Sequence, residues 1–313
     1  MAADQKALIR FVVAAAVLTG FAIARADSPP PRPADAPVRI ISLVPAVTEM
    51  LYEMGAGGKV VAVSSYDRYP PEVQRLPNVG ALIDPNVERI LSLKPDLVVV
   101  YGSQSDLKQQ LARAGIGVFD YRHAGLADVT TTIRALGERT GDAVKAAALA
   151  ERIERGLRDI RARVQGRPRP RTLLVFGRER LALRGLYASG GIGFLNDMLD
   201  VAGGTNVFAD VKIQAVQAST EQVLAARPDV ILETRAANSA FPTGDRDAEL
   251  NVWKVLGSVP AVRNRRVLFL FDDRIVIPGP RVVEGTAVMA RALHPEAFAA
   301  DAAGRAVGAG VQR

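Results

Sequence analysis

Cysteine is absent from all 313 residues of the sequence. This absence excludes disulfide bonds, thiolate chemistry and cysteine-ligated metal sites. It also leaves no residue for the lipid-modified cysteine that tethers many exported bacterial proteins to a membrane. Histidine is scarce, since only His123 and His294 occur. A zinc or manganese site, which needs several converging histidines and carboxylates, is therefore a weak alternative.

Long apolar runs are missing once the N-terminus has been passed. Lys6 and Arg10 form a short basic segment before an apolar stretch at 11–23. This stretch is followed by the small-residue cleavage pattern Ala-Arg-Ala at 24–26. Its apolar core is shorter than the roughly 20 residues of a membrane-spanning helix. We therefore predict a secretory signal peptide over 1–26. The expected location is the periplasm, with cleavage near Ala26 and no lipid anchor.

Strong charge of one sign is also missing. The net charge of +7 comes from 40 Lys and Arg against 33 Asp and Glu, and loss of residues 1–26, which carry a net +2, lowers it to +5. The basic residues are spread among carboxylates, without clustered runs or interleaved aromatic residues. We therefore expect no nucleic-acid partner.

Two stretches of the chain are nearly the same, ERILSLKPDLVVV at 88–100 and EQVLAARPDVILE at 221–233. In each copy we expect a short amphipathic helix that ends at the residue before proline, Lys94 or Arg227. That residue is pushed out of the α region by the proline ring. The continuous apolar run that follows is typical of a parallel strand buried on both faces.

Each copy begins with a glutamate in the first helical turn, Glu88 or Glu221. Asn86 precedes the first helix and Ser219 or Thr220 the second, so both helices have N-cap residues. The helix dipole favours an anion at this end. A single such glutamate is most simply a surface residue, but the duplication favours a shared function.

Strands and helices alternate through the first half of the chain, after a lead-in at 27–37 that is rich in proline and alanine. The pattern predicts strands at 38–43, 60–63, 97–101 and 117–121, and helices from Pro45 to a closing Gly55, at 104–114 and at 126–140. Such alternation favours a parallel α/β lobe.

A longer helix is predicted at 143–164, where apolar residues keep a helical period. Acidic and basic residues sit four apart in three pairs, Glu151 with Arg155, Glu154 with Arg158 and Asp159 with Arg163, a spacing that stabilises helices. At 1.5 Å per residue the helix would be roughly 33 Å long. That is long enough to join two lobes.

The α/β pattern then begins again, with strands at 172–176 and 267–271 and a final helix at 282–293. GFLNDMLDVAGG at 193–204 is similar to TEMLYEMGAGG at 48–58. This second match occurs in the same order as the first, which indicates a duplicated lobe.

The order of these motifs resembles the periplasmic substrate-binding proteins of the helical-backbone class. The resemblance spans 38–298 and rests on four motifs, ISLVPAVTEML at 41–51, SSYDRYPP at 64–71, NVERILSLKPDLVV at 86–99 and VQASTEQVLAARPDVIL at 216–232. This class serves ABC importers of cobalamin, haem and iron-siderophores, and the cobalamin-binding members are the most similar.

The resemblance implies an α/β fold of two pseudo-symmetric doubly wound lobes, joined by one long rigid helix, with the ligand cleft between the lobes. Glu88 and Glu221 would then dock onto arginines of the permease. The expected segments are the signal peptide 1–26, a disordered lead-in 27–37, the N-terminal lobe 38–142, the linking helix 143–166, the C-terminal lobe 167–298 and a loose tail 299–313.

Ligands of doubly wound lobes bind outside the carboxyl ends of the strands. The loops there offer eight candidate ligand contacts: Tyr66, Tyr69, Tyr101, Arg178, Tyr187, Arg235, Asp273 and Arg274. Aromatic faces suit a flat macrocycle, and a few polar groups would orient it. The resemblance implies that Tyr69 lines the corrinoid face and that Asp273 contacts the corrin side chains.

Cobalamin or another corrinoid is the favoured ligand, and haem or an iron-siderophore is the alternative. Cobalamin binders carry a tryptophan where this chain has Leu82-Ile83, and the single tryptophan here, Trp253, has the pattern of a helical core residue. Haem would need an axial His or Tyr, and His123 follows a strand near the predicted cleft. An anionic siderophore would favour the arginines at 178, 235, 274 and 281.

Enzymatic motifs are not found in the structural setting that each requires. The sequence has no nucleophile elbow, phosphate loop or dinucleotide fingerprint between a strand and a helix. The glycine-rich stretch at 185–193 lacks the fingerprint spacing. An adhesion module would not need a duplicated glutamate-bearing unit. We therefore expect a monomeric carrier without a cofactor, whose partners are a small-molecule ligand and an importer permease.

Overall fold

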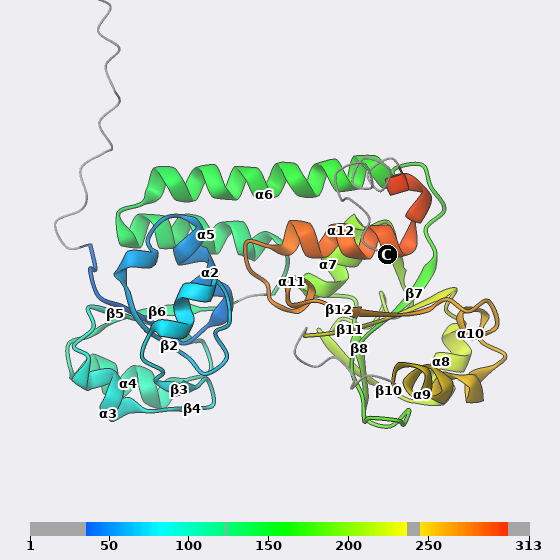
Figure 1. Cartoon of the computed structure of the whole chain (residues 1–313), viewed down its shortest axis with the longest axis horizontal. Coiled ribbons are helices and arrows are strands. Elements are labelled where there is room, and N and C mark those ends of the chain that lie inside the picture. Colours follow the sequence, from blue (N-terminus) through cyan, green and yellow to red (C-terminus); the bar gives the residue numbers. More distant parts are fainter. Residues whose placement is uncertain (1–35, 123, 237–244, 300–313) are drawn as a thin grey trace, which may run out of the picture. The chain divides into compact units, whose positions relative to one another are not determined.

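The computed structural model describes residues 36–122, 124–236 and 245–299. All of these belong to one compact unit, Ala34–Arg313, which contains two α/β lobes (Figure 1). The predicted signal peptide, most of the lead-in and nearly all of the tail lie outside the described residues. The lobe boundaries given above stay a prediction.

The N-terminal lobe is built on a parallel four-stranded sheet with the strand order β2-β1-β5-β6. The strands are β1 (Ile40–Ser42), β2 (Val60–Val63), β5 (Leu97–Tyr101) and β6 (Gly117–Tyr121), beside a small hairpin of β3 (Gly80–Ala81) and β4 (Asp84–Pro85). The helices are α2 (Pro45–Glu53), α3 (Val87–Ser92), α4 (Ser105–Arg113) and α5 (Ala127–Thr140). The two central strands are buried almost completely, as their apolar runs predicted.

The C-terminal lobe has a mixed six-stranded sheet with the order β10-β8-β7-β11-β12, and the short β9 pairs with β7. Its strands are β7 (Arg171–Gly177), β8 (Leu186–Ser189), β9 (Thr205–Asn206), β10 (Ala215–Ala218), β11 (Val230–Arg235) and β12 (Val267–Phe271). Its helices are α7 (Phe194–Val201), α8 (Thr220–Ala226), α9 (Asp245–Asn251), α10 (Pro260–Arg263), α11 (Asp273–Val276) and α12 (Val282–Leu293).

The two sheets differ in the direction of their second strand, which is β2 in the N-terminal lobe and β8 in the C-terminal lobe. In the N-terminal lobe β2 runs parallel to β1, whereas β8 runs antiparallel to β7. The connection from Gly177 to Leu186 is too short for a parallel crossover, which needs a dozen or more residues. The expected doubly wound pattern is therefore confirmed in β7, β11 and β12 and interrupted by β8 and β10.

The linking helix α6 (Ala143–Val164) has the predicted bounds. Helix α12 packs along it, and at Gly156 the contact is so close that a Cβ atom would lie 2.6 Å from a methyl carbon of Val283. Of the predicted ion pairs, Glu151 with Arg155 is present at 3.6 Å. The prediction for Glu154 was wrong, because its carboxylate binds Arg134 of α5 instead.

No helix among the described residues combines the length and the apolar composition that a membrane span requires.

One apolar cluster continues from the N-terminal lobe through α6 into the C-terminal lobe. Ile40 of β1, Ile153 of α6 and Leu232 of β11 all belong to it. Each lobe has a further cluster on the other face of its sheet, which includes Ile41 in the N-terminal lobe and Ile231 in the C-terminal lobe. A shared core resists large movements between the lobes, because separating them would expose packed apolar surface.

The helices of the repeat end slightly earlier than predicted. Both Lys94 and Arg227 have positive φ, 47° and 46°, so neither is helical. The last helical residues are Ser92 and Ala226. The proline that follows disfavours the right-handed α region, and in both copies the residue takes the left-handed region instead.

Candidate ligand cleft

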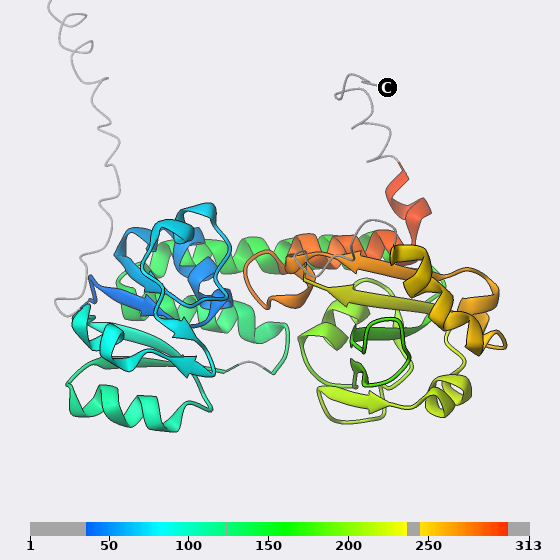
Figure 2. The same cartoon turned by 60° about the horizontal axis from the view of Figure 1, so that its bottom comes forward.

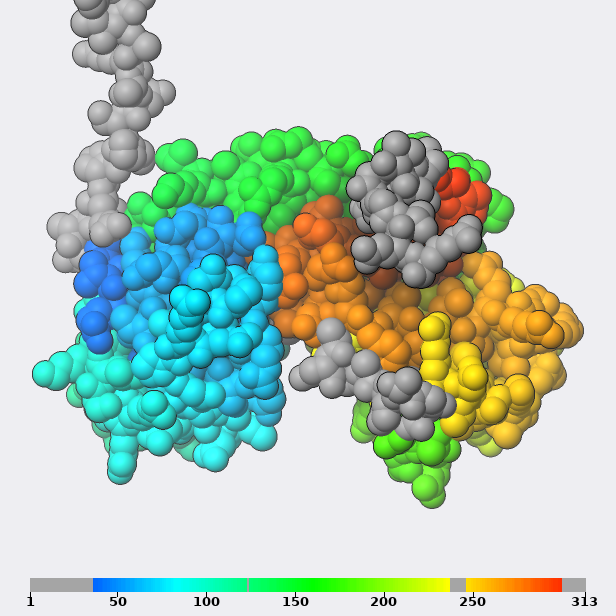
Figure 3. Space-filling model, in the orientation of Figure 1, coloured from blue at the N-terminus to red at the C-terminus, as the bar shows by residue number. Residues whose placement is uncertain are grey.

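The surface is hollowed between the two lobes, below α11 and α12 in the view of Figure 3. The parallel strands of the N-terminal sheet and strands β11 and β12 of the C-terminal sheet point toward each other across this cleft (Figures 1 and 2). The loops that follow the strands of both lobes therefore face it. This is the position at which doubly wound folds bind their ligands.

Tyr69 lies beneath a cation that joins the two lobes. Arg281, at the start of α12, places its guanidinium carbon 4.0 Å from the centre of the Tyr69 ring. The same guanidinium donates from Nε to Oε2 of Glu49 at 2.8 Å. Glu49 belongs to α2 and is 2% exposed. A residue of the last helix is thus bonded to the first helix of the other lobe.

Burial raises the pKa of the Glu49 carboxyl above its ordinary value, although the bond from Arg281 opposes this shift. The charges of Asp273 and Asp67 raise the pKa further. Neither Glu49 nor its pairing with Arg281 was predicted from the sequence. The sequence does place the Glu49 carboxylate between the apolar positions Val47 and Met50, and this pattern could have indicated that Glu49 is buried.

The other candidate tyrosines differ in exposure. Tyr66 and Tyr187 are 54% and 42% exposed, so both present aromatic surface to solvent. Tyr187 also stacks on Phe176, with ring centres 6.4 Å apart. Tyr101 is half-buried and meets Tyr121 edge to face at 5.8 Å. Burial raises the pKa of the Tyr101 phenol, so this group stays neutral over the physiological range.

Arg178 lies in the interior of the C-terminal lobe and not at its surface. Its side chain has no exposed area, and it is bonded to Glu233 at 2.9 Å and to Glu249 at 2.7 Å. It could reach a ligand only by breaking its bonds to both buried carboxylates, at a cost of several kcal/mol. The sequence placed Arg178 at a strand end correctly but could not show that its charge is used internally.

The remaining candidate cations are also engaged. Arg235 binds Glu233 at 2.7 Å, and Arg274 binds Asp272 with Nε at 2.8 Å from Oδ1. Burial of Asp272 is outweighed by the hydrogen bonds from Arg274, which hold the pKa of this carboxyl below its ordinary value. All four arginines proposed for an anionic siderophore, those at 178, 235, 274 and 281, therefore carry a carboxylate partner.

Of the eight predicted contacts, the structure brings Tyr69 and Asp273 together with Glu49 and Arg281, since Asp273 acts on the charges of both. Trp253 is fully buried in the core of the C-terminal lobe, as its pattern predicted. His123 lies outside the described residues. Within the described part of the chain, no three His, Asp or Glu side chains gather so that they could hold a metal ion.

Glu88 and Glu221, the predicted docking residues, are both exposed in the first turns of α3 and α8. The Asn86 side chain accepts from the Arg89 N–H at 2.9 Å and so caps α3. Ser219 caps α8 in a reciprocal pair with Gln222. A hydrogen bond from Ser219 lowers the pKa of Glu221, which keeps this exposed carboxylate charged.

Residues 40–273 match the protein family described as periplasmic binding protein. The chain belongs to the periplasmic binding protein family. An uncharacterised ABC transporter substrate-binding lipoprotein of Bacillus subtilis, YvrC, is 33% identical over 268 residues, which are 84% of this chain and 82% of that protein. A vitamin B12-binding protein of Yersinia pestis is 34% identical over 202 residues, 64% of this chain and 70% of the relative.

Solved structures of this family have the same fold. The periplasmic vitamin B12-binding protein BtuF of Vibrio cholerae is 27% identical with a TM-score of 0.69, covering 82% of this chain and 96% of that one. The periplasmic haem-binding protein RhuT of Roseiflexus sp. RS-1 is 28% identical with a TM-score of 0.70, covering 83% and 98%. The chain is thus a periplasmic binding protein of the ABC importer type, and its relatives include proteins named for different ligands.

Proposed function

We propose that this protein captures a bulky, flat metal chelate in the cleft, with a corrinoid favoured, and delivers it to an importer permease. It acts as a carrier and not as an enzyme. The observation that supports this proposal most is the Tyr69 ring beside Arg281, whose charge is offset by Glu49, together with the carboxylate partners of Arg235 and Arg274. Aromatic faces and few free charges suit a large, weakly charged macrocycle.

The same observation weakens the siderophore alternative. A ferric siderophore with a net negative charge would need cations that are free to pair with it. Arg235, Arg274 and Arg281 each have a carboxylate partner that already offsets their charge. The similarity to vitamin B12-binding proteins supports the corrinoid without deciding it.

Haem is the second candidate, because Tyr69 could supply an axial oxygen. Tyr69 is half-buried, and Arg281 lies against one face of its ring. Haem-binding proteins among the structural relatives support this candidate.

Absorbance titration with cyanocobalamin, haemin and a ferric hydroxamate siderophore separates the three ligand classes. We expect saturable spectral change with cyanocobalamin at one molecule per chain. Saturation with haemin alone would replace the corrinoid by haem, and binding of the siderophore alone would overturn the argument from neutralised arginines. Binding of none of the three would contradict the ligand class.

Tyr69→Phe distinguishes stacking from ligation. The variant keeps the ring under Arg281 and removes only the hydroxyl. A corrinoid that packs on the ring should bind nearly as well as to the wild type, because its contact is the aromatic face. A haem held by the Tyr69 oxygen should lose its Soret shift.

We also propose that Glu88 and Glu221 dock the loaded protein onto the permease. Replacing both by Ala should leave ligand affinity unchanged while abolishing uptake in cells that carry the cognate importer. Glu151→Ala, an exposed glutamate on α6, is the matched control and should transport normally. A large loss of affinity in the double variant would show that these residues belong to the ligand site instead.

We propose further that the exported chain is not tethered to the membrane, although the relative YvrC is described as a lipoprotein. The support is the lack of cysteine in all 313 residues. Mass spectrometry of the protein released by osmotic shock should give a chain that starts near Asp27 without a lipid.

A further inference from the structure

The two helices of the repeat, α3 and α8, expose side chains at the same positions. Counted from the glutamate, the first, second, fourth, fifth and seventh residues are exposed in both copies. Only the first and the fourth are identical, and they are the glutamate and a leucine. The two copies therefore share an exposed surface only at Glu88 with Leu91 and at Glu221 with Leu224. The other three exposed positions hold Arg89, Ser92 and Lys94 in one copy and Gln222, Ala225 and Arg227 in the other.

The two leucines are exposed to nearly the same extent, 38% for Leu91 and 39% for Leu224. The apolar residue that each helix turns into its lobe is the preceding one, Ile90 or Val223, which is buried. Among the described residues, Ile90 and Val223 belong to the apolar clusters of their lobes, and neither leucine does. The core of each lobe is therefore built without these leucines.

Each leucine lies beside the glutamate of its own helix, because residues three apart on a helix are neighbours on one face. In Figure 1, α6 runs along the top of the molecule, and α3 and α8 lie in its lower half. A single exposed leucine is common on protein surfaces and needs no explanation. The same leucine, equally exposed beside the same charge in both lobes, is a repeated surface.

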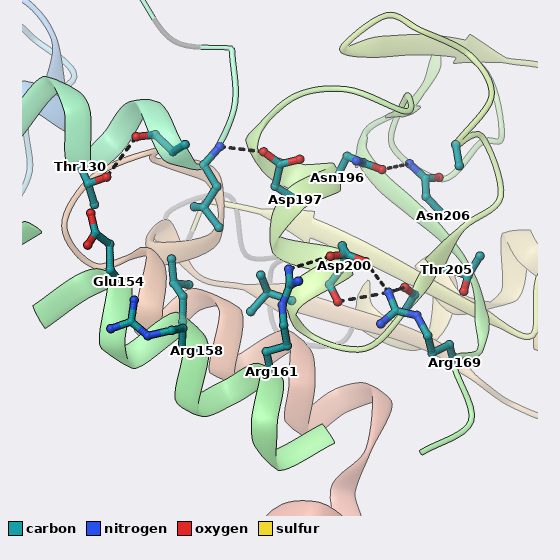
Figure 4. A pocket seen from close by; sticks show the side chains of 16 residues that line it. Thr130, Glu154, Arg158, Arg161, Arg169, Asn196, Asp197, Asp200, Thr205 and Asn206 are labelled. Carbon is teal, nitrogen blue, oxygen red and sulfur yellow. Dashed lines mark hydrogen bonds and ion pairs between the residues drawn. The ribbon is translucent and has the colours of Figure 1, made fainter. Parts of the chain in front are cut away.

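The two glutamates also differ from carboxylates that are paired within the chain. At a hollow beside α6, both oxygens of Asp200 accept from arginine side chains (Figure 4). Glu154, at the same hollow, accepts from Arg134 at 2.9 Å. Among the described residues, no cation forms an ion pair with Glu88 or Glu221. Their charges are therefore available to a partner that carries cations.

Unpaired glutamates alone would make a weak contact with such a partner. An ion pair that stays exposed to water contributes little to association, because both charges are already well solvated. An apolar side chain that packs beside the pair excludes water and so strengthens the attraction. Its own burial adds to the affinity. A glutamate next to an exposed leucine is suited to a contact of this kind.

We propose that Leu91 and Leu224 form the apolar part of the contact with the permease. Each leucine packs against an apolar side chain of the partner, beside the cation that pairs with the neighbouring glutamate. This contact rests on the proposed docking of Glu88 and Glu221, and it adds the chemistry of the partner surface. Because both lobes present the same two side chains, the partner is a membrane protein with two matching faces, each with a cation next to an apolar side chain.

Binding of the full chain to the purified cognate importer, held in lipid nanodiscs, tests this contact by biolayer interferometry at low and at high sodium chloride. Leu91→Ser and Leu224→Ser remove the leucines singly and together. Val144→Ser is the matched control, because Val144 is an exposed apolar residue of α6. The double variant Glu88→Gln, Glu221→Gln tests the docking function separately. Far-UV circular dichroism checks that each variant is folded.

Each leucine variant should weaken binding about tenfold, and the two together about a hundredfold. The binding that remains should decrease more steeply with salt than that of the wild type, because its ion pairs are open to water. Val144→Ser should bind as the wild type does.

The glutamate variant separates the two ways in which this proposal can fail. Unchanged binding in the double leucine variant, with weakened binding in the glutamate variant, would overturn the leucine contact and leave the docking function standing. Unchanged binding in the glutamate variant would overturn the docking function itself. A loss in only one of the single leucine variants would contradict a partner with two matching faces.

Discussion

The two copies of the repeat are held in place by the same contacts, one copy in each lobe. Asp96 accepts from the backbone N–H of Arg39 at 2.9 Å, just before β1. Asp229 accepts from the N–H of Arg171 at 3.0 Å, at the start of β7. In return the Asp96 and Asp229 N–H groups donate to the carbonyls of Arg39 and Arg171. The repeated Pro-Asp turn is therefore a clamp on the first strand of its lobe.

The side chains of Arg39 and Arg171 also make matching contacts in the two lobes. Arg39 donates to the carbonyl of Leu93 at 2.7 Å, and Arg171 donates to the carbonyl of Ala226 at 2.9 Å. Each cation thus satisfies a carbonyl at the C-terminal end of a repeat helix, where the helix dipole favours positive charge. Backbone geometry and its anchoring are common to the two lobes.

The copies differ where the strands approach the cleft. Val100 and Glu233 occupy the same position of the repeat, and both are buried. In the N-terminal lobe the valine packs in an apolar cluster, whereas in the C-terminal lobe the glutamate binds Arg178 and Arg235. The duplicated backbone thus supports an apolar strand end in one lobe and an ionic network in the other.

The largest effect on stability is expected when Glu233 of the second copy is replaced by valine, the residue that the first copy has at position 100. Glu233→Val removes one of the two carboxylates that pair with the fully buried side chain of Arg178. We expect a loss of about 3–5 kcal/mol in the free energy of unfolding, measured with urea. The triple variant Arg178→Met, Glu233→Val, Glu249→Gln should recover most of it, because no buried charge is then left alone. A loss below about 1 kcal/mol in the single variant would contradict a tightly coupled network.

The second largest loss in the free energy of unfolding is expected when the bond between Glu49 and Arg281, which joins the lobes, is weakened. Glu49→Gln replaces one of the two oxygens that accept from Arg281 by an NH2 group, which is a donor facing a donor, and we expect a loss of about 2 kcal/mol for this hydrogen bond to a charged group. Because burial raises the pKa of Glu49 above its ordinary value of 4.5, the folded state binds a proton more readily than the unfolded state. Proton binding by Glu49 therefore increases the free energy of unfolding of the wild type as the pH falls through the folded pKa toward 4.5.

The measurement is urea unfolding of both proteins at several pH values between neutrality and 4.5. The advantage of the wild type over Glu49→Gln should grow as the pH is lowered. Asp67 and Asp273 lie near Glu49 in both proteins, so the direct contribution of their charges largely cancels in the difference. A difference that shrinks on acidification would show that pairing with Arg281 outweighs burial.

Replacing Asp96 or Asp229, the aspartates of the two Pro-Asp turns, should lower the free energy of unfolding by smaller and unequal amounts. Asp96→Ala removes an acceptor that serves two backbone N–H groups, those of Val38 and Arg39. Asp229→Ala removes one such bond. We expect losses of about 1.5 and about 1 kcal/mol, modest because the first site is exposed to water. Equal losses in thermal unfolding would mean that the Val38 bond contributes nothing.

The smallest expected effect is a gain. Lys94 and Arg227 hold nearly the same left-handed conformation, which costs energy in any residue with a Cβ atom. Lys94→Gly and Arg227→Gly should each stabilise the protein by about 0.5 kcal/mol after the added flexibility of the unfolded chain is counted. Gains that differ between the two copies would show that their side chains make unequal contacts.

Local pattern predicted much of the fold because the relevant interactions are close in sequence. The bounds of α6 and α12 and of the strands β2, β5, β6 and β12 agree with prediction, since apolar periodicity and the Gly and Pro residues act within a few positions. Strand β8, which runs antiparallel to β7, was not predicted, because strand pairing depends on loop length and on the free edge of the sheet. The site was predicted as a set of strand-end loops, but the partner of each cation was not.

The sequence by itself determined two lobes, the helix that joins them and the matched position of Glu88 and Glu221, because the repeated helix-to-strand unit is set by interactions between residues close in sequence. Only the tertiary structure decided which charges remain free. Arg281 and Glu49 are 232 positions apart, and Arg178 and Glu249 are 71 apart. Electrostatic energy depends on distance in space and on exclusion of water, and neither can be read from residue order.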